Sequence, residues 1–308
     1  MRLRATRWFA ALSPRRRLLT GASLLIVAGL VAVGALRAAQ GGDATVPAGP
    51  GTSQPGAAQS AAAQSGAGQS GAGRSGVSPP GGGQPTTVIL VPGYGGNTGS
   101  LGTLAARIRA KGDTALIVAL PSGGTGDLEA QADTLNGYVN QALRGGARSV
   151  DVIGYSAGGV VARLWDVEHD GASKVSKIIT LGSPLHGAEL AAVGAALDPS
   201  ACPAACQQLV PGSALLTRLA GIPLTGRPAW LSLWTVNDQT VQPPDSARLP
   251  GAVNVPLQSV CPSAVIQHGQ LPADPLVVGI VLRALGQVQI AAPAAADCAS
   301  LRALGSAG

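Results

Sequence analysis

DVIGYSAGGV, residues 151–160, places a serine between glycines directly after an apolar run. The five residues 154–158 (GYSAG) fit the pattern G-x-S-x-G, in which a sharp turn joins a buried strand to a helix and lifts the serine hydroxyl above a sheet. A side chain at position 154 or 158 would crowd that turn. Ser156 is therefore a candidate nucleophile if a strand precedes it and a helix follows it; otherwise the glycines form only a tight turn.

Strand-like and helix-like segments alternate on both sides of this turn. Continuous apolar strands that alternate with amphipathic helices predict an α/β fold, in which a mostly parallel sheet is covered by helices on both faces. A helical and loop-rich insertion, ending at residue 227, precedes the penultimate strand. Chemistry in such sheets is found at the carboxyl ends of the strands, where Ser156 is expected. We predict strands at 86–91, 115–120, 149–153, 175–181, 229–236 and 252–257, and helices at 100–110, 127–143, 157–167 and 275–285.

The first 37 residues have the composition of a targeting segment. Residues 1–17 carry six arginines and no acid, and residues 18–36 carry no charge. As a helix, these nineteen residues would measure roughly 28 Å, close to the thickness of the hydrocarbon core. The basic flank predicts a cytoplasmic N-terminus and export of everything that follows. Residues 1–37 are then either a cleaved signal peptide or an uncleaved signal anchor that associates with the membrane, and SPRRRLL at 13–19 keeps a twin-arginine export route open.

A linker and one catalytic domain are predicted after this segment. Residues 38–85 consist mostly of Gly, Ala, Ser, Gln and Pro, with a five-residue near-repeat, and they offer almost nothing to bury. Such a segment cannot offset its chain entropy and is predicted to be a disordered tether. Residues 86–308 remain for a folded domain.

Charge excludes a nucleic-acid partner. The net charge of +6 comes from the N-terminal part, because residues 1–85 hold eight arginines and one acid. Residues 86–308 hold thirteen basic and fourteen acidic side chains, without a basic stripe that could bind phosphates.

Four cysteines lie in the part predicted to be exported. An even count in an oxidising compartment favours disulfides. The spacing favours the pairs Cys202–Cys206 and Cys261–Cys298, which is one of three connectivities. A zinc site is the alternative, but no second close pair of Cys or His completes a tetrahedral set, and we expect no metal.

A nucleophilic serine needs a histidine base. Folds with this elbow order the triad along the chain as serine, acid, histidine. His268 alone follows the last predicted strand. His169 lies in a charged stretch at a helix end and is expected to be a solvated surface residue, whereas His186 precedes the acid candidates and is expected to shape the site.

The acid should follow the penultimate strand. Asp238 comes at the end of that strand and is preferred to Asp245, which follows two prolines in a loop. Asp198 and Glu189 come earlier and belong to the insertion.

Two backbone amides should form the oxyanion hole. Ala157 follows the nucleophile at the helix N-terminus, and Tyr94 is the best-placed donor in the glycine-rich loop after the first strand. That loop lacks the lysine of a P-loop and the spacing of a dinucleotide fingerprint.

Several motifs together resemble the secreted bacterial lipases and esterases of the α/β-hydrolase superfamily, over most of residues 86–285. Two motifs depart from the usual pattern: the first has Pro-Gly where many relatives have His-Gly, and SPLHG replaces the commoner Thr-Pro-His-x-Gly. These departures bear on the preferred chain length. The motifs are VPGYGG, GYSAGG, TLGSPLHGAEL, LVPGSALLTRL, VNDQTVQPPDSA and QHGQLPADPLV.

The resemblance implies a triad of Ser156, Asp238 and His268, with Tyr94 and Ala157 as amide donors. It implies hydrolysis of carboxylic esters, such as lipids or acylglycerols, through an acyl-enzyme and without a cofactor. A thioesterase or acyltransferase with the same triad is an alternative, as is an inactive tethered binding protein. Export predicts either a secreted protein or one held at the cell surface by its N-terminal helix; the oligomeric state is not indicated.

Overall fold

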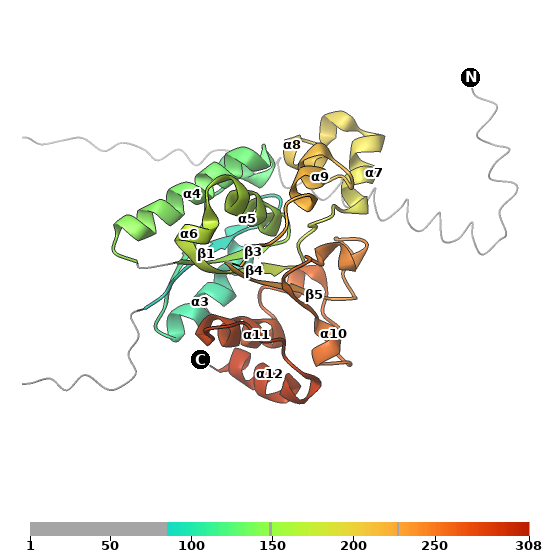
Figure 1. The fold of residues 1–308 in the computed structure, drawn as a ribbon. Helices are drawn as coiled ribbons and strands as arrows, with labels where there is room; N and C mark the ends of the chain where they lie inside the picture. Colours follow the sequence, from blue (N-terminus) through green and yellow to red (C-terminus); the bar gives the residue numbers. More distant parts are fainter. Residues whose placement is uncertain (1–84, 148–149, 227, 308) are drawn as a thin grey trace, which may run out of the picture. The chain divides into compact units, whose positions relative to one another are not determined.

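A computed structural model of the chain describes residues 85–147, 150–226 and 228–307 (Figure 1). The targeting segment predicted at 1–37, and the linker predicted at 38–85 apart from its last residue, lie outside the described residues. None of the helices in the described part of the chain has both the length and the apolar character that a membrane span requires.

The described strands form a six-stranded sheet in which every neighbouring pair is parallel. The spatial order is β2-β1-β3-β4-β5-β6, so the chain runs from β1 to one edge and then crosses to the other side of β1. This reversal is a topological switch point, and it opens a crevice at the carboxyl ends of β1 and β3. The strands are β1 Thr87–Val91, β2 Thr114–Ile117, β3 Val150–Tyr155, β4 Val175–Leu181, β5 Ala229–Trp234 and β6 Val253–Pro256.

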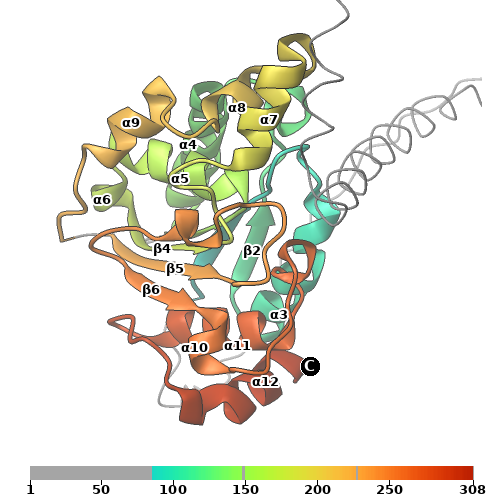
Figure 2. The same cartoon turned by 90° about the vertical axis from the view of Figure 1, so that its right-hand side faces the viewer.

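Helices cover both faces of the sheet (Figures 1 and 2). Side chains alternate along β1: Val88 and Leu90 pack in a core with α3, α10, α11 and α12, while Ile89 and Val91 pack in a second core with α4, α5, α8 and α9. Burial of both faces explains why apolar residues occupy both faces of the strands rather than every second position. The helices are α3 Gly102–Ala110, α4 Leu128–Arg144, α5 Ala157–Glu168, α6 Gly171–Lys174, α7 Glu189–Leu197, α8 Ala204–Gln208, α9 Ala214–Ala220, α10 Leu257–Val260, α11 Pro275–Gly286 and α12 Cys298–Ser306.

The predicted fold class is confirmed, and each predicted strand and helix is present with ends shifted by a few residues. The final helix α12 was not predicted, because residues 298–306 carry few large apolar side chains. It packs on α11 through glycines instead: a Cβ at Gly279 would lie 1.9 Å from the carbonyl oxygen of Leu301, and one at Gly305 would lie 1.9 Å from that of Pro275. The two helices approach so closely that only glycine fits at these positions.

The insertion between β4 and β5 contains α7, α8 and α9 (Figure 2), and buried residues of α8 and α9 belong to the core that α4 and α5 share. The structure forms disulfides Cys202–Cys206, within this insertion, and Cys261–Cys298, which joins the end of α10 to the start of α12. This is the pairing that the spacing favoured. The second bridge closes a loop of 37 residues in sequence separation, so chain entropy gives it about 4 kcal/mol of stabilisation.

Candidate active site

Ser156 lies on the turn between β3 and α5 in a backbone conformation that L-amino acids rarely adopt, with φ 53° and ψ −128°. Glycines make the turn sterically feasible. A Cβ at Gly158 would lie 2.3 Å from the carbonyl oxygen of Val91, and one at Gly154 would lie 2.5 Å from the Cα of Gly159. The serine is therefore held in a strained conformation by close packing of the strand, the turn and the helix.

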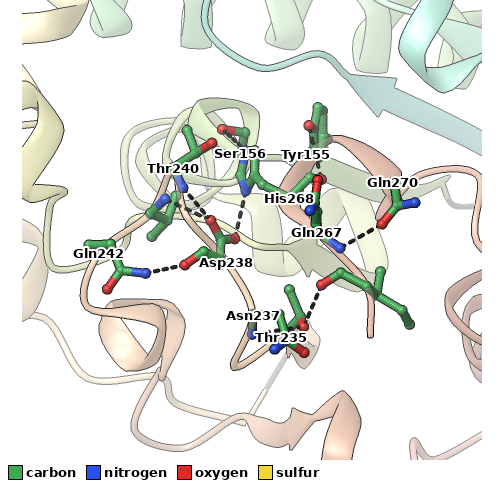
Figure 3. A network of polar contacts seen from close by, with 12 residues as sticks. Tyr155, Ser156, Thr235, Asn237, Asp238, Thr240, Gln242, Gln267, His268 and Gln270 are labelled. Atoms are coloured by element: carbon green, nitrogen blue, oxygen red, sulfur yellow. Dashed lines mark hydrogen bonds and ion pairs between the residues drawn. The ribbon is translucent and has the colours of Figure 1, made fainter. Parts of the chain in front are cut away.

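Three side chains that are far apart in the sequence form one chain of hydrogen bonds (Figure 3). His268 Nε2 lies 3.0 Å from Ser156 Oγ, and His268 Nδ1 lies 2.7 Å from Asp238 Oδ2. The aspartate is 2% exposed and the histidine 7% exposed, so water competes little for these bonds. With Nδ1–H donating to the carboxylate, Nε2 is the free acceptor for the serine hydroxyl.

Backbone amides fix the second oxygen of the aspartate. Asp238 Oδ1 accepts hydrogen bonds from the amides of Thr240, at 2.9 Å, and Val241, at 2.8 Å. The side chain of Gln242 donates to the backbone oxygen of Asp238. The carboxylate thus has one oxygen held by the turn and the other directed at the imidazole.

Tyr155, the last residue of β3, contacts His268. Its hydroxyl donates to the backbone oxygen of His268 at 3.2 Å, and the centroids of the two rings lie 5.2 Å apart (Figure 3). Burial, and then the charge of Asp238, raises the pKa of Tyr155 to about 12, so the hydroxyl remains a donor at neutral pH. This residue was not predicted from the sequence, because it occupies the variable position just before the serine.

An apolar cavity of about 190 Å³ opens beside the serine hydroxyl. Its walls come from the elbow, the loop after β4, the helices α7 and α8, and the turn after Asp238. The lining residues are Tyr94, Ser156, Ala157, Pro184, Ala188, Leu190, Ala191, Cys206, Leu209, Thr240 and Val241.

Both predicted oxyanion donors line this cavity. Ala157 is the first residue of α5, where unpaired amides and the helix dipole favour negative charge. Tyr94 lies in the loop after β1, which packs directly against Ser156: a Cβ at Gly93 would lie 2.8 Å from the Cβ of Ser156. The loop backbone can approach the serine because position 93 has no side chain.

The remaining candidates lie apart from this chain of hydrogen bonds. His186 is exposed, with Nδ1 3.0 Å from the backbone oxygen of Ser246, and His169 pairs with Asp133 at 3.0 Å at the end of α5. Asp245 is an exposed residue of the 3₁₀ helix Pro244–Ala247.

The two acids of the insertion, Asp198 and Glu189, also lie apart from this chain of hydrogen bonds. Asp198 accepts from the amides of Ser200 and Ala201, and Glu189 begins α7. In the part of the chain that the structure describes, no three His, Cys, Asp or Glu side chains are grouped to bind a metal ion.

Comparisons with known proteins agree with the fold. A family described as "PGAP1-like alpha/beta domain" matches residues 122–197, which include the elbow. No curated protein matches the sequence.

Among solved structures, lipase B of Aspergillus fumigatus is similar at 17% identity and a TM-score of 0.56, over 72% of this chain and 61% of the lipase. Lipase BlEst2 of Bacillus licheniformis in its propeptide form is similar at 18% identity and a TM-score of 0.54, over 68% of this chain and 51% of that one. This chain thus spans about half to three fifths of the length of these two lipases. In strand order, elbow and covering helices, the chain has the α/β-hydrolase fold.

Proposed function

We propose that the protein is a serine hydrolase that cleaves carboxylic esters, with lipids or acylglycerols as substrates. The observation that carries this proposal is the hydrogen-bonded chain from Ser156 through His268 to Asp238 at the mouth of an apolar cavity. A nucleophile, a base and an orienting acid in this arrangement are what acyl transfer requires.

In the proposed reaction, Ser156 Oγ attacks the ester carbonyl while His268 Nε2 takes its proton. The imidazolium then protonates the departing alcohol, which leaves an acyl-enzyme. A water molecule next attacks the acyl carbonyl while His268 takes its proton, and the imidazolium returns this proton to Ser156 Oγ as the acid is released. Asp238 keeps the proton of the histidine on Nδ1 and stabilises the imidazolium charge.

The amides of Ala157 and Tyr94 stabilise the oxyanion in this proposal. Negative charge develops on the carbonyl oxygen as the serine attacks, and each preset donor lowers the barrier by roughly 3 kcal/mol. Their place around the same cavity as Ser156 supports this role.

An acyl chain fits the surroundings of the serine. Of the described residues that line the cavity, most are aliphatic and none is charged. At its rim, α7 has no buried residue, and Leu190, Val193 and Leu197 are 57%, 47% and 74% exposed along one side of this helix. Apolar surface beside an apolar pocket favours lipid substrates over small polar esters.

Export is part of the proposal. Both disulfides lie within the described domain, and structural disulfides persist in oxidising compartments. This agrees with the targeting segment predicted at 1–37, whether it is cleaved or retained as an anchor.

A series of p-nitrophenyl esters, from acetate to palmitate, tests the reaction and the acyl site together. We expect hydrolysis that Ser156→Ala abolishes and that favours chains longer than acetate. Ala191→Trp, which fills the cavity, should shift the preference to acetate, whereas Ala196→Trp, on an exposed position of the same helix, should not. Thioester cleavage without ester cleavage would instead indicate a thioesterase.

A further inference from the structure

The acid and the histidine of the proposed triad are carried by two separate loops. Asp238 lies in the turn after β5, whereas His268 lies in the loop that follows β6 and α10. The 2.7 Å contact between Asp238 and His268 therefore depends on the bonds that hold these two loops together.

The hydroxyl of Thr235 is one link between the loops. It donates to the backbone oxygen of Ile266 at 2.7 Å and accepts from the amide of Asn237 at 3.2 Å (Figure 3). Thr235 has no exposed surface, so these bonds are shielded from water. One hydroxyl thus joins the turn just before the acid to the chain two residues before the histidine.

The side chain of Gln258, on α10, is the second link. Its amide nitrogen lies 3.0 Å from Thr235 Oγ1, 3.0 Å from Asn237 Oδ1 and 3.0 Å from the backbone oxygen of Ala264. Its amide oxygen accepts from the backbone amide of Val236 at 3.0 Å. All contacts on the acid side fall within residues 235–237, and the contact on the histidine side precedes His268 by four residues.

We propose that Thr235 and Gln258 are positioning residues that set the geometry between Asp238 and His268. Neither lines the cavity beside Ser156, so neither touches the substrate in the proposed reaction. They act through the acid and the histidine, because together they bond the backbones of both loops. This inference rests on the proposed serine hydrolase function.

A purely structural role predicts a different outcome. If these bonds only stabilised the fold, their loss would lower the melting temperature and leave kcat of the folded enzyme unchanged. Loss of positioning instead lowers kcat and leaves KM nearly unchanged, because the acyl cavity is intact while the base is misaligned.

The test uses substitutions that keep the shape of each side chain. Thr235→Val removes the hydroxyl, Thr235→Ser keeps it, and Gln258→Met removes the amide at similar length. We expect kcat for p-nitrophenyl butyrate to fall about 10- to 100-fold in Thr235→Val and about 10-fold in Gln258→Met, with KM within about twofold of wild type. Thr235→Ser should restore most of the lost activity.

Asn254 provides a matched control. It is another half-buried amide on the same part of the chain, and its side chain bonds the backbone of Leu249 and Ala252, which lie before β6 and outside both loops. Asn254→Leu should lower the melting temperature without lowering kcat of the folded protein.

The outcomes separate this inference from the proposed function. Ester hydrolysis that survives in Ser156→Ala overturns the function and the inference with it. If Ser156→Ala is inactive while Thr235→Val and Gln258→Met keep the kcat of wild type, only the positioning role is wrong. A loss of kcat in Asn254→Leu as large as that in Thr235→Val and Gln258→Met also contradicts the positioning role. If Thr235→Val does not fold, the kcat of Gln258→Met, a substitution at a half-buried position, tests the positioning role.

Discussion

Replacing Asp238 with asparagine should lower kcat for ester hydrolysis by about 10⁴ while the domain stays folded. The substitution keeps the size of the side chain and removes only its charge and one acceptor. A factor of 10⁴ corresponds to about 5.4 kcal/mol in the activation free energy.

The structure indicates how the asparagine would be oriented. The amides of Thr240 and Val241, at 2.9 and 2.8 Å, require an acceptor, so the amide oxygen would take the place of Oδ1. The NH₂ group would then face His268 Nδ1, where the carboxylate oxygen now lies at 2.7 Å. A donor in that place forces Nδ1 to accept and moves the proton to Nε2, which can no longer take the proton of Ser156.

Steady-state kinetics on p-nitrophenyl butyrate measures this effect, with circular dichroism to verify folding. Asp245→Asn is the matched control, because Asp245 is the other acid near this point of the sequence and is exposed on a 3₁₀ helix. It should retain the kcat of wild type. Full activity in Asp238→Asn, or a large loss in Asp245→Asn, would refute the assignment of the acid.

Three further predictions concern the stability of the fold. Gly158→Ala should unfold the domain or lower its melting temperature sharply, since its Cβ would lie 2.3 Å from a carbonyl oxygen of β1, whereas Gly137→Ala, in open space on α4, should stabilise it by about 0.5–1 kcal/mol; equal melting temperatures would contradict this. Serine at both Cys261 and Cys298 should cost about 4 kcal/mol in the free energy of unfolding, measured with urea; an unchanged midpoint would be inconsistent with the bridge. Tyr155→Phe removes one hydrogen bond and should cost about 0.5–1.5 kcal/mol of stability, measured in the same way, and no change would mean that the bond contributes nothing.

The central fold was predictable because its signals are local. The strands from β1 to β5 are mostly apolar runs, and the elbow joins β3 to α5 through glycines at positions where a side chain would not fit. The contact between His268 and Asp238 follows the order expected from the sequence, since the chain has three histidines and only His268 follows the last strand.

Other parts depend on tertiary contacts that no local pattern indicates. The helix α12 is held by its glycine contacts with α11 and by a disulfide, rather than by an apolar stripe of its own. Thr235 and Gln258 look like ordinary polar residues in the sequence. Their bonds to Ile266 and Ala264 appear only when the loops after β5 and β6 come together.

The central claim is that Ser156 is an activated nucleophile, and covalent labelling by a fluorophosphonate tests it most directly. We predict one adduct per chain by intact mass, located on Ser156 by peptide mapping, and no adduct in Ser156→Ala or after denaturation. A wild-type protein that takes up no label while folded, or one labelled equally in Ser156→Ala, would contradict the account.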